Sequence, residues 1–338
     1  MSTSSPYSNL PPGSGPDGGT LLGFLASIGA LVVFTRIYPS KKITLHWEQS
    51  LGWRARLLID MEQLTTEHLT SLHGFLIDGR NRNRFTLCKR LGGERYKTIS
   101  KLELSDATRF LTEAIKSNPA HERNDLCSSY GGWFSDQPDE KEASATKLCA
   151  LTGGSQQNFL ETALDLSGFH KNEKREQRST TVENLRETLL SPWSYKDPMP
   201  GCRWEAQEDR HYALRHRNPT KHHRGEGQET YDGLVRTQRG ANRLGIEALS
   251  IFPLMPKRVR AETPGFRFDR ECGYQFTWAI WDCPLTLDAV RLLVAHPELV
   301  EGKPNMHELR SLGIRALFRS TRITKGKGQV SFTIARPL

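Results

Sequence analysis

Four histidines, at positions 211, 216, 222 and 223, are the side chains of this chain whose type is best suited to bind a metal ion or to transfer protons. His222 and His223 are adjacent, so on a helix they would point in different directions. Pro219 interrupts the segment, and no Cys or carboxylate stands at metal-ligand spacing. We therefore predict a polar loop here and no metal site.

Arg217 and His222 match the R-x4-H spacing of one ribonuclease superfamily. That chemistry needs both side chains on one helical face, and Asn218-Pro219 disfavours a helix at this point. The chain also lacks a P-loop, an HExxH motif and a GxSxG motif. We predict no catalytic residues; the alternative is a divergent metal-dependent nuclease whose side chains are assembled only by folding.

Gly13, Gly15 and Gly18 form a literal GxGxxG. No strand precedes it and Pro16 lies inside it, so no dinucleotide site is expected.

The six cysteines include no CxxC pair, which gives neither a zinc signature nor a disulfide framework. We therefore predict no cofactor and a reduced, cytoplasmic protein.

Basic residues are more informative, because they cluster in a chain whose formal net charge is +9. Residues 80–101 hold eight Lys or Arg and one acid, and residues 310–338 hold seven and no acid. In both clusters the cations alternate with apolar residues and glycines, which favours a folded surface that follows a phosphate backbone over a disordered tail. The candidate phosphate-binding residues are Arg80, Arg82, Arg84, Lys89, Arg90, Arg319, Arg322, Lys325 and Lys327. A solvated face or an acidic protein partner is the alternative.

A second group of candidates could make closer contacts. Gln156, Gln157 and Asn242 carry amides that can form paired hydrogen bonds with base edges, and Arg239 and Arg243 could accompany them. Each of these side chains could equally cap a helix or satisfy a buried loop. The apolar stripe that follows Arg243 predicts a core helix.

These candidates must be positioned by helices and strands that interleave without a βαβ period, which predicts an α+β fold of mixed helices and antiparallel strands. Thr20 is a plausible N-cap for a helix that ends near Tyr38. Its apolar run, residues 21–34, is too short to span a bilayer, so we predict a buried core helix and no membrane segment. Its small residues Gly23, Ala26, Ser27, Gly29 and Ala30 would let another element approach closely. Further helices are expected over 61–78, 105–117, 158–168, 181–190, 241–250 and 286–296, and strands over 43–47, 53–59, 274–281, 314–320 and 329–334.

Composition predicts either one large domain or two lobes. Residues 1–19 are rich in Ser, Pro and Gly and are expected to be a disordered lead-in. Residues 20–170 would form an N-terminal α+β lobe and residues 201–338 a C-terminal one with a basic end. The segment 171–200 would be a linker or a charged helix.

Several stretches resemble protein families of type I-G (formerly I-U) CRISPR loci. Residues 21–31, followed by a Pro, a strand ending in Trp47 and then Gly52-Trp53-Arg54, resemble the opening of the large-subunit-like and helicase-nuclease-extension families of those loci. The other matching stretches are 204–214, 239–253, 276–284 and 318–328. The resemblance therefore extends from about residue 20 to the C-terminal end.

This resemblance implies a non-catalytic subunit of a crRNA-guided interference complex, a Cascade-type assembly of antiviral defence. Its implied partners are crRNA, target DNA and the other CRISPR subunits, including the helicase-nuclease. In guide-RNA systems base pairing reads the sequence, while the protein reads backbone and shape. Whether the chain is the large subunit or an accessory is left open, as is a protein-only adaptor that recruits the helicase-nuclease.

Overall fold

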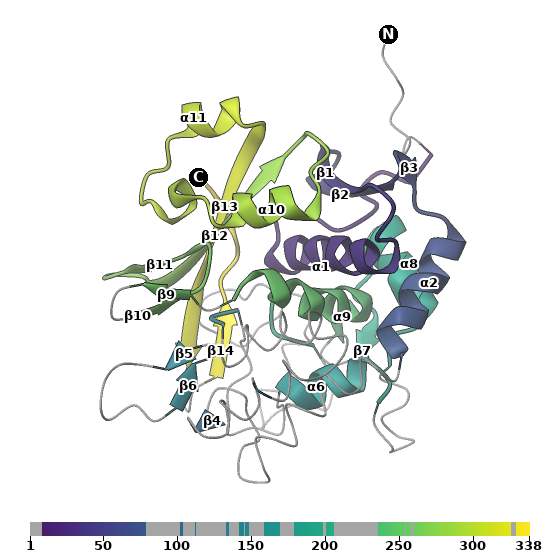
Figure 1. Ribbon diagram of the computed structural model, residues 1–338, viewed down its shortest axis with the longest axis horizontal. Helices are drawn as coiled ribbons and strands as arrows, with labels where there is room; N and C mark the ends of the chain where they lie inside the picture. The colour runs from purple at the N-terminus through teal and green to yellow at the C-terminus, as the bar shows by residue number, and fades with distance from the viewer. Residues whose placement is uncertain are drawn as a thin grey trace, which may run out of the picture.

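The computed structural model of the chain describes residues 9–78, 102–103, 112, 133–134, 142–144, 146–148, 159–169, 179–198, 201–205, 236–253, 255–257, 260–325 and 329–338. Helices and antiparallel sheets make up the fold, so the predicted α+β class is confirmed. Helix α1 crosses the centre of the molecule (Figure 1). Strands β12 and β13 lie on one side of it, and helices α2 and α8 on the other.

Helix α1 (Leu21–Ile37) is buried on every side through its first fourteen residues, from Leu21 to Phe34. The Thr20 hydroxyl accepts a hydrogen bond from the Gly23 amide at 3.1 Å, which confirms the predicted N-cap. The helix ends at Ile37, and Tyr38 is its C-cap, just before Pro39. The prediction of a core helix is therefore confirmed. None of the helices in the described part of the chain is long and apolar enough to cross a membrane.

Helix α9 (Arg239–Ala248) crosses α1 at a glycine. A Cβ added to Gly29 would lie 1.8 Å from the carbonyl oxygen of Leu244, so the two backbones are closer than any residue with a side chain permits. Gly23 makes a similar approach to the backbone of Asp17, at 2.1 Å. The predicted role of these small residues in close packing is confirmed at both positions.

Residues 9–19 are packed into the fold, so the prediction of a disordered lead-in was wrong for this segment. Ser14 is fully buried, and the Gly15 amide donates to the Ser191 carbonyl at 3.0 Å. The indole of Trp278 donates to the Gly18 carbonyl at 2.7 Å. The glycines therefore allow a compact backbone path between two distant segments, because Gly13 and Gly15 adopt φ values of 79° and 85° that disfavour other residues.

Beside α1 lies a meander of β1 (Ile43–Gln49), β2 (Trp53–Ile59) and β3 (Glu62–Gln63). Helices α2 (Thr66–Ile77) and α8 (Val182–Leu190) each begin with a capping box, at Thr65 and Thr181. Helix α6 is Phe159–Leu166. The predicted helix over 105–117, apart from residue 112, and the charged segment 170–178 lie outside the described residues.

His46 on β1 provides a test of pH dependence. Burial lowers the pKa of this imidazole, with Arg56 acting in the same direction, while Glu48 and Asp282 partly oppose the shift. The unfolded chain, with a His pKa near 6.5, therefore binds protons more readily than the folded one, and stability falls as pH drops below about 6.5. We expect wild-type protein to lose more unfolding free energy between about pH 7.5 and 5.5 than His46→Gln, measured by urea denaturation. Equal losses would contradict this.

A five-stranded antiparallel sheet fills the other side of the molecule. Its order is β11 (Phe266–Asp269), β12 (Gly273–Trp281), β13 (Ile314–Lys325) and β14 (Gln329–Phe332), with β15 (Arg336–Pro337) also paired to β13. Between β12 and β13 the chain forms α10 (Leu287–Val294), η4 (Pro297–Val300) and α11 (Met306–Ser311).

Short pairings complete the described structure. They are β7 (Asp197–Pro198) with β8 (Arg236–Thr237), β9 (Met255–Lys257) with β10 (Arg260–Glu262), and β6 (Glu142–Ser144) with both β4 (Leu102–Glu103) and β5 (Trp133–Phe134). A single 3-10 turn, η3 (Leu249–Ile251), continues α9.

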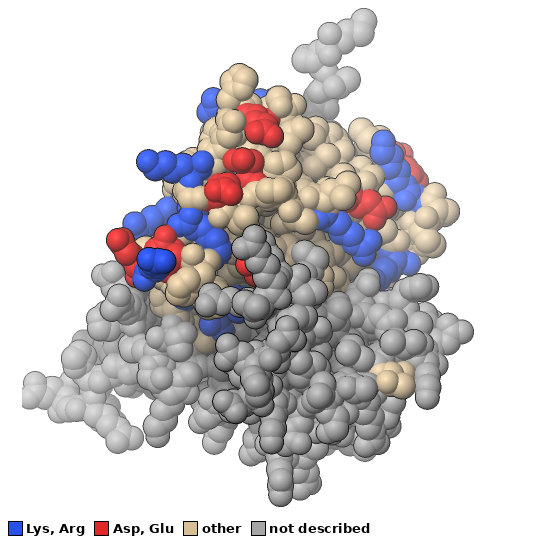
Figure 2. Space-filling view, turned by 60° about the vertical axis from the view of Figure 1, so that its left-hand side comes forward, with Lys and Arg blue, Asp and Glu red and all other residues tan. Residues whose placement is uncertain are grey.

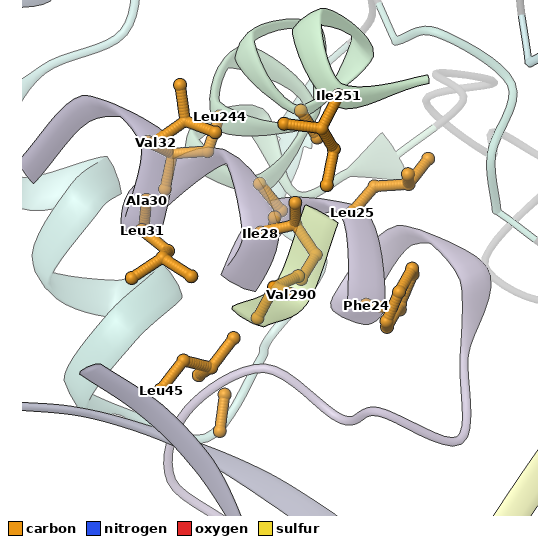
Figure 3. Close-up of a cluster of buried hydrophobic side chains, with 14 of the residues drawn as sticks. Phe24, Leu25, Ile28, Ala30, Leu31, Val32, Leu45, Leu244, Ile251 and Val290 are labelled. Carbon is orange, nitrogen blue, oxygen red and sulfur yellow. The ribbon is translucent and has the colours of Figure 1, made fainter. Parts of the chain in front are cut away.

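One hydrophobic cluster joins both sides of the proposed 171–200 boundary. Figure 3 shows Leu45 of β1, Leu244 of α9 and Val290 of α10 around the side chains of α1. The Trp281 indole donates to the Leu45 carbonyl at 2.8 Å, which bonds the early strand to the late one. This shared core favours one large domain over two separate lobes, because neither half buries α1 by itself.

Candidate nucleic-acid interface

The C-terminal sheet has two chemically different faces, as strand alternation requires. On the inner face Trp278 packs against Phe24 of α1, with ring centroids 5.7 Å apart. Along β12, Gln275 and Thr277 alternate with the inner residues Phe276 and Trp278, so their side chains point to the outer face. On this outer face Gln275 is half-buried and Thr277 is buried, so polar groups lie opposite the aromatic core.

Three arginines from three different strands lie on this outer face. Arg267 of β11 pairs in register with Gln275, and Arg319 of β13 pairs with Thr277. On the other edge of β13, Arg336 of β15 pairs directly with Arg319. We call Arg267, Arg319 and Arg336 the outer-face arginines.

Arg319 is held firmly at the centre of this row. Its Nε donates to the Thr277 hydroxyl at 2.8 Å, and its Nη2 and Nη1 donate to the carbonyls of Glu301 and Gly302 at 2.6 and 3.2 Å. Burial lowers the pKa of this guanidinium, and the nearby positive charge of Arg267 lowers it further. A guanidinium stays protonated in proteins nonetheless, so the strand carries a fixed positive charge with restricted motion.

Arg267 is partly neutralised. Its Nε donates to the Gln275 side chain at 2.8 Å, and its Nη2 donates to Asp269 at 2.6 Å. Backbone amides of Cys272 and Glu271 lower the pKa of the Asp269 carboxyl, with Arg267 acting in the same direction. The carboxylate is therefore ionised at neutral pH and offsets one of the three positive charges.

Arg336 is the accessible member of the row. It is exposed, and among the described residues no ion pair joins it to an acidic side chain. Arg336 stands in register with Arg319, whose guanidinium is directed toward Thr277 and the carbonyls of Glu301 and Gly302. The planar, forked guanidinium suits phosphate oxygens, which makes a phosphate the natural anion for this position.

The sheet divides the predicted C-terminal basic cluster between its faces. Arg319 points outward, whereas Arg322, three residues later, lies on the inner side and donates to the Lys147 carbonyl at 3.1 Å. The Lys147 ammonium lies 4.2 Å from the centroid of the Tyr274 ring. Burial lowers the pKa of Lys147, and Arg322 lowers it further. The cluster is therefore two smaller basic groups on opposite faces, not one patch.

The remaining predicted cations divide as follows. Lys325 is the last residue of β13. The other candidates lie outside the described residues: Lys327, the first-cluster residues Arg80, Arg82, Arg84, Lys89 and Arg90, and the amides Gln156 and Gln157. Figure 2 shows basic and acidic side chains intermixed over the described part of its face.

The predicted contacts at Arg239, Asn242 and Arg243 require correction. Asn242 is fully buried, where its Oδ1 accepts from the Cys202 amide at 2.6 Å and its Nδ2 donates to Glu205 at 3.0 Å. This is the buried-loop role that the sequence left open as an alternative. A base edge could reach this amide only if α9 left the core.

The two arginines of α9 are internal as well. Arg243 is fully buried and donates to Glu247 at 2.9 Å and to the Leu76 carbonyl at 3.3 Å. Arg239 is 6% exposed and donates to the Ser179 carbonyl at 3.2 Å. Their positive charges stabilise the fold around α9, and we do not include them in the interface.

Sequence reasoning missed three participants: Arg267, Arg336 and Lys147. The alternation in Phe266-Arg267-Phe268-Asp269 is a strand signal that could have predicted the outward position of Arg267. Arg336 was counted in the basic cluster, but its place opposite Arg319 depends on a register that one sequence does not display. Lys147 belongs to a segment without a hydrophobic periodicity from which a helix or strand, and hence a side-chain direction, could be predicted.

Within the described ranges, no group of three or more His, Cys, Asp and Glu side chains could hold a metal ion. The histidines at 211, 216, 222 and 223 lie outside those ranges, so the prediction of a polar loop there stays a prediction.

No protein-family model matches this chain, and no curated protein matches its sequence.

Proposed function

We propose that this chain is a cytoplasmic, non-catalytic subunit of a crRNA-guided CRISPR interference complex, which contacts nucleic-acid backbone and neighbouring subunits. The CRISPR assignment depends on the resemblance of residues 21–54, 204–214, 239–253, 276–284 and 318–328 to type I-G families. Its partners would be crRNA, target DNA and the other subunits, with the helicase-nuclease among the proteins it helps to recruit.

The structural observation that supports nucleic-acid contact is the pairing of Arg319 with Arg336 across β13 and β15. The two residues stand in register on neighbouring strands, so a phosphate bound by Arg336 would lie near a second positive charge. Arg319 is oriented by three hydrogen bonds, so little conformational entropy is lost when it binds. No observation in the described residues favours the nuclease alternative.

Arg336→Glu tests this proposal without threatening the fold, because it places an acid opposite Arg319 and should leave stability unchanged or slightly higher. Lost phosphate contact should weaken binding of labelled RNA and DNA. The plot of log affinity against log salt should become shallower by about 0.7–0.9. Arg186→Glu on α8, on the far side of α1 from the sheet, is the control with the same change in charge.

Equal losses of affinity in Arg336→Glu and Arg186→Glu would mean that only net charge matters, and would contradict an interface on the sheet.

Membership of the complex is tested separately. The tagged chain, co-expressed with its neighbouring genes, should copurify with short RNAs that carry a repeat-derived end and with stable protein partners. Purification of the chain alone would overturn the proposed membership.

A further inference from the structure

The hairpin of β11 and β12 ends in an aromatic pair that extends past the core. Phe268 and Tyr274 face each other in register, with ring centroids 5.1 Å apart and a T-shaped arrangement. The preceding inner pair, Phe266 and Phe276, is buried against the rest of the sheet. In Figure 1 β11 lies at the edge of the fold, away from α1. The aromatic row therefore continues from the core into solvent.

Phe268 is 57% exposed. The face of Tyr274 is already occupied by the Lys147 ammonium, 4.2 Å from the ring centroid. Phe268 is therefore the more exposed ring of this pair. An exposed phenyl ring costs solvation free energy, which a planar ligand would recover by covering it.

The charges around this ring favour a polyanionic ligand. Lys147 and Arg322 lie on the same side of the sheet, joined by the bond from Arg322 to the Lys147 carbonyl, and Arg270 is exposed in the adjoining turn. The acids nearby are Asp269, which Arg267 and two backbone amides already engage, the exposed Glu271, and Glu262, which acts on Lys147. An aromatic platform beside cations is the combination by which proteins hold single-stranded nucleic acid.

We propose that Phe268, supported by Tyr274 and Lys147, stacks on an unpaired base of a single-stranded nucleic acid. This rests on the proposed function and deepens it, because the outer-face arginines would bind phosphates of either duplex or single strand, whereas a ring can stack only on an exposed base. The hairpin would therefore select unpaired RNA or displaced DNA.

The test compares Phe268→Leu and Phe268→Trp on an unstructured single strand, oligo(U), and on duplex RNA of the same length. Leucine keeps the apolar volume but removes the π face, so single-strand affinity should fall by about 5- to 150-fold while duplex affinity stays unchanged. Tryptophan should retain affinity, and its fluorescence should be quenched by oligo(U). Leu292→Ala, which removes another exposed apolar side chain on α10, is the control and should change neither.

The outcomes separate the two proposals. If wild type binds no nucleic acid of either kind, the proposed function and the stacking role both fail. If wild type binds with the expected salt dependence and Phe268→Leu binds oligo(U) equally well, the stacking role alone is overturned. Unchanged nucleic-acid affinity in Phe268→Leu, together with loss of copurifying subunits, would assign the ring to a protein contact and also overturn it.

Discussion

Replacing Glu247 with alanine should lower the free energy of unfolding by about 3–5 kcal/mol. Glu247 and Arg243 are both fully buried, with an Oε1 to Nη1 distance of 2.9 Å, and Arg36 reaches the other carboxylate oxygen at 3.3 Å. The substitution removes a carboxylate that lies 2.9 Å from the buried Arg243 guanidinium, in an environment of low polarity. Urea denaturation monitored by tryptophan fluorescence would measure the loss.

The control is the exposed pair of Asp288 and Arg291 on α10, with a spacing of three residues instead of four. Asp288→Ala should change stability by less than about 0.5 kcal/mol, because solvent screens an exposed pair. Removing both buried charges, in Arg243→Met with Glu247→Leu, should cost less than Glu247→Ala alone. A double variant that is less stable than the single one would contradict the view that removing one buried charge while keeping the other causes the loss.

Gly29→Ala should destabilise the protein by about 3 kcal/mol or more, at or beyond the upper end of the usual cost of overpacking. Alanine is the better helix former, so a solvent-exposed site would predict the opposite sign. At Gly29 the new methyl group would lie 1.8 Å from the Leu244 carbonyl oxygen, and only a movement of α9 away from α1 could relieve the clash.

Gly74 of α2 provides the matched control, because a Cβ there would meet nothing within 4 Å. Gly74→Ala should stabilise the protein by about 0.5–1 kcal/mol. Thermal unfolding of both variants beside wild type measures the contrast. Stabilisation by both substitutions would show that α1 and α9 are not closely packed in solution.

Local signals in the sequence were sufficient to predict much of the secondary structure. Thr20 and Pro39 mark the ends of α1, because a side-chain oxygen can cap the first amides and proline cannot continue a helix. Residues 53–59 were predicted as a strand with the same bounds that the structure has for β2. These features depend on residues that are neighbours along the chain, so one sequence contains them.

The candidate site was only partly predictable, because it depends on which residues become neighbours across strands. Arg319 and Arg322 looked equivalent in the sequence, yet the period of two along β13 places them on opposite faces of the sheet. The register of β15 then brings Arg336 opposite Arg319. No local pattern contains a register between strands.

The sequence by itself determined the α+β class, the central apolar helix and the basic character of the C-terminal strands. Only the tertiary structure decided that residues 9–19 pack into the fold and that Arg239, Asn242 and Arg243 are buried. Polar side chains such as Asn242 are compatible with either a surface or an internal network. The partners that decide between these, Cys202 and Glu205, are some forty residues away in the chain and meet it only on folding.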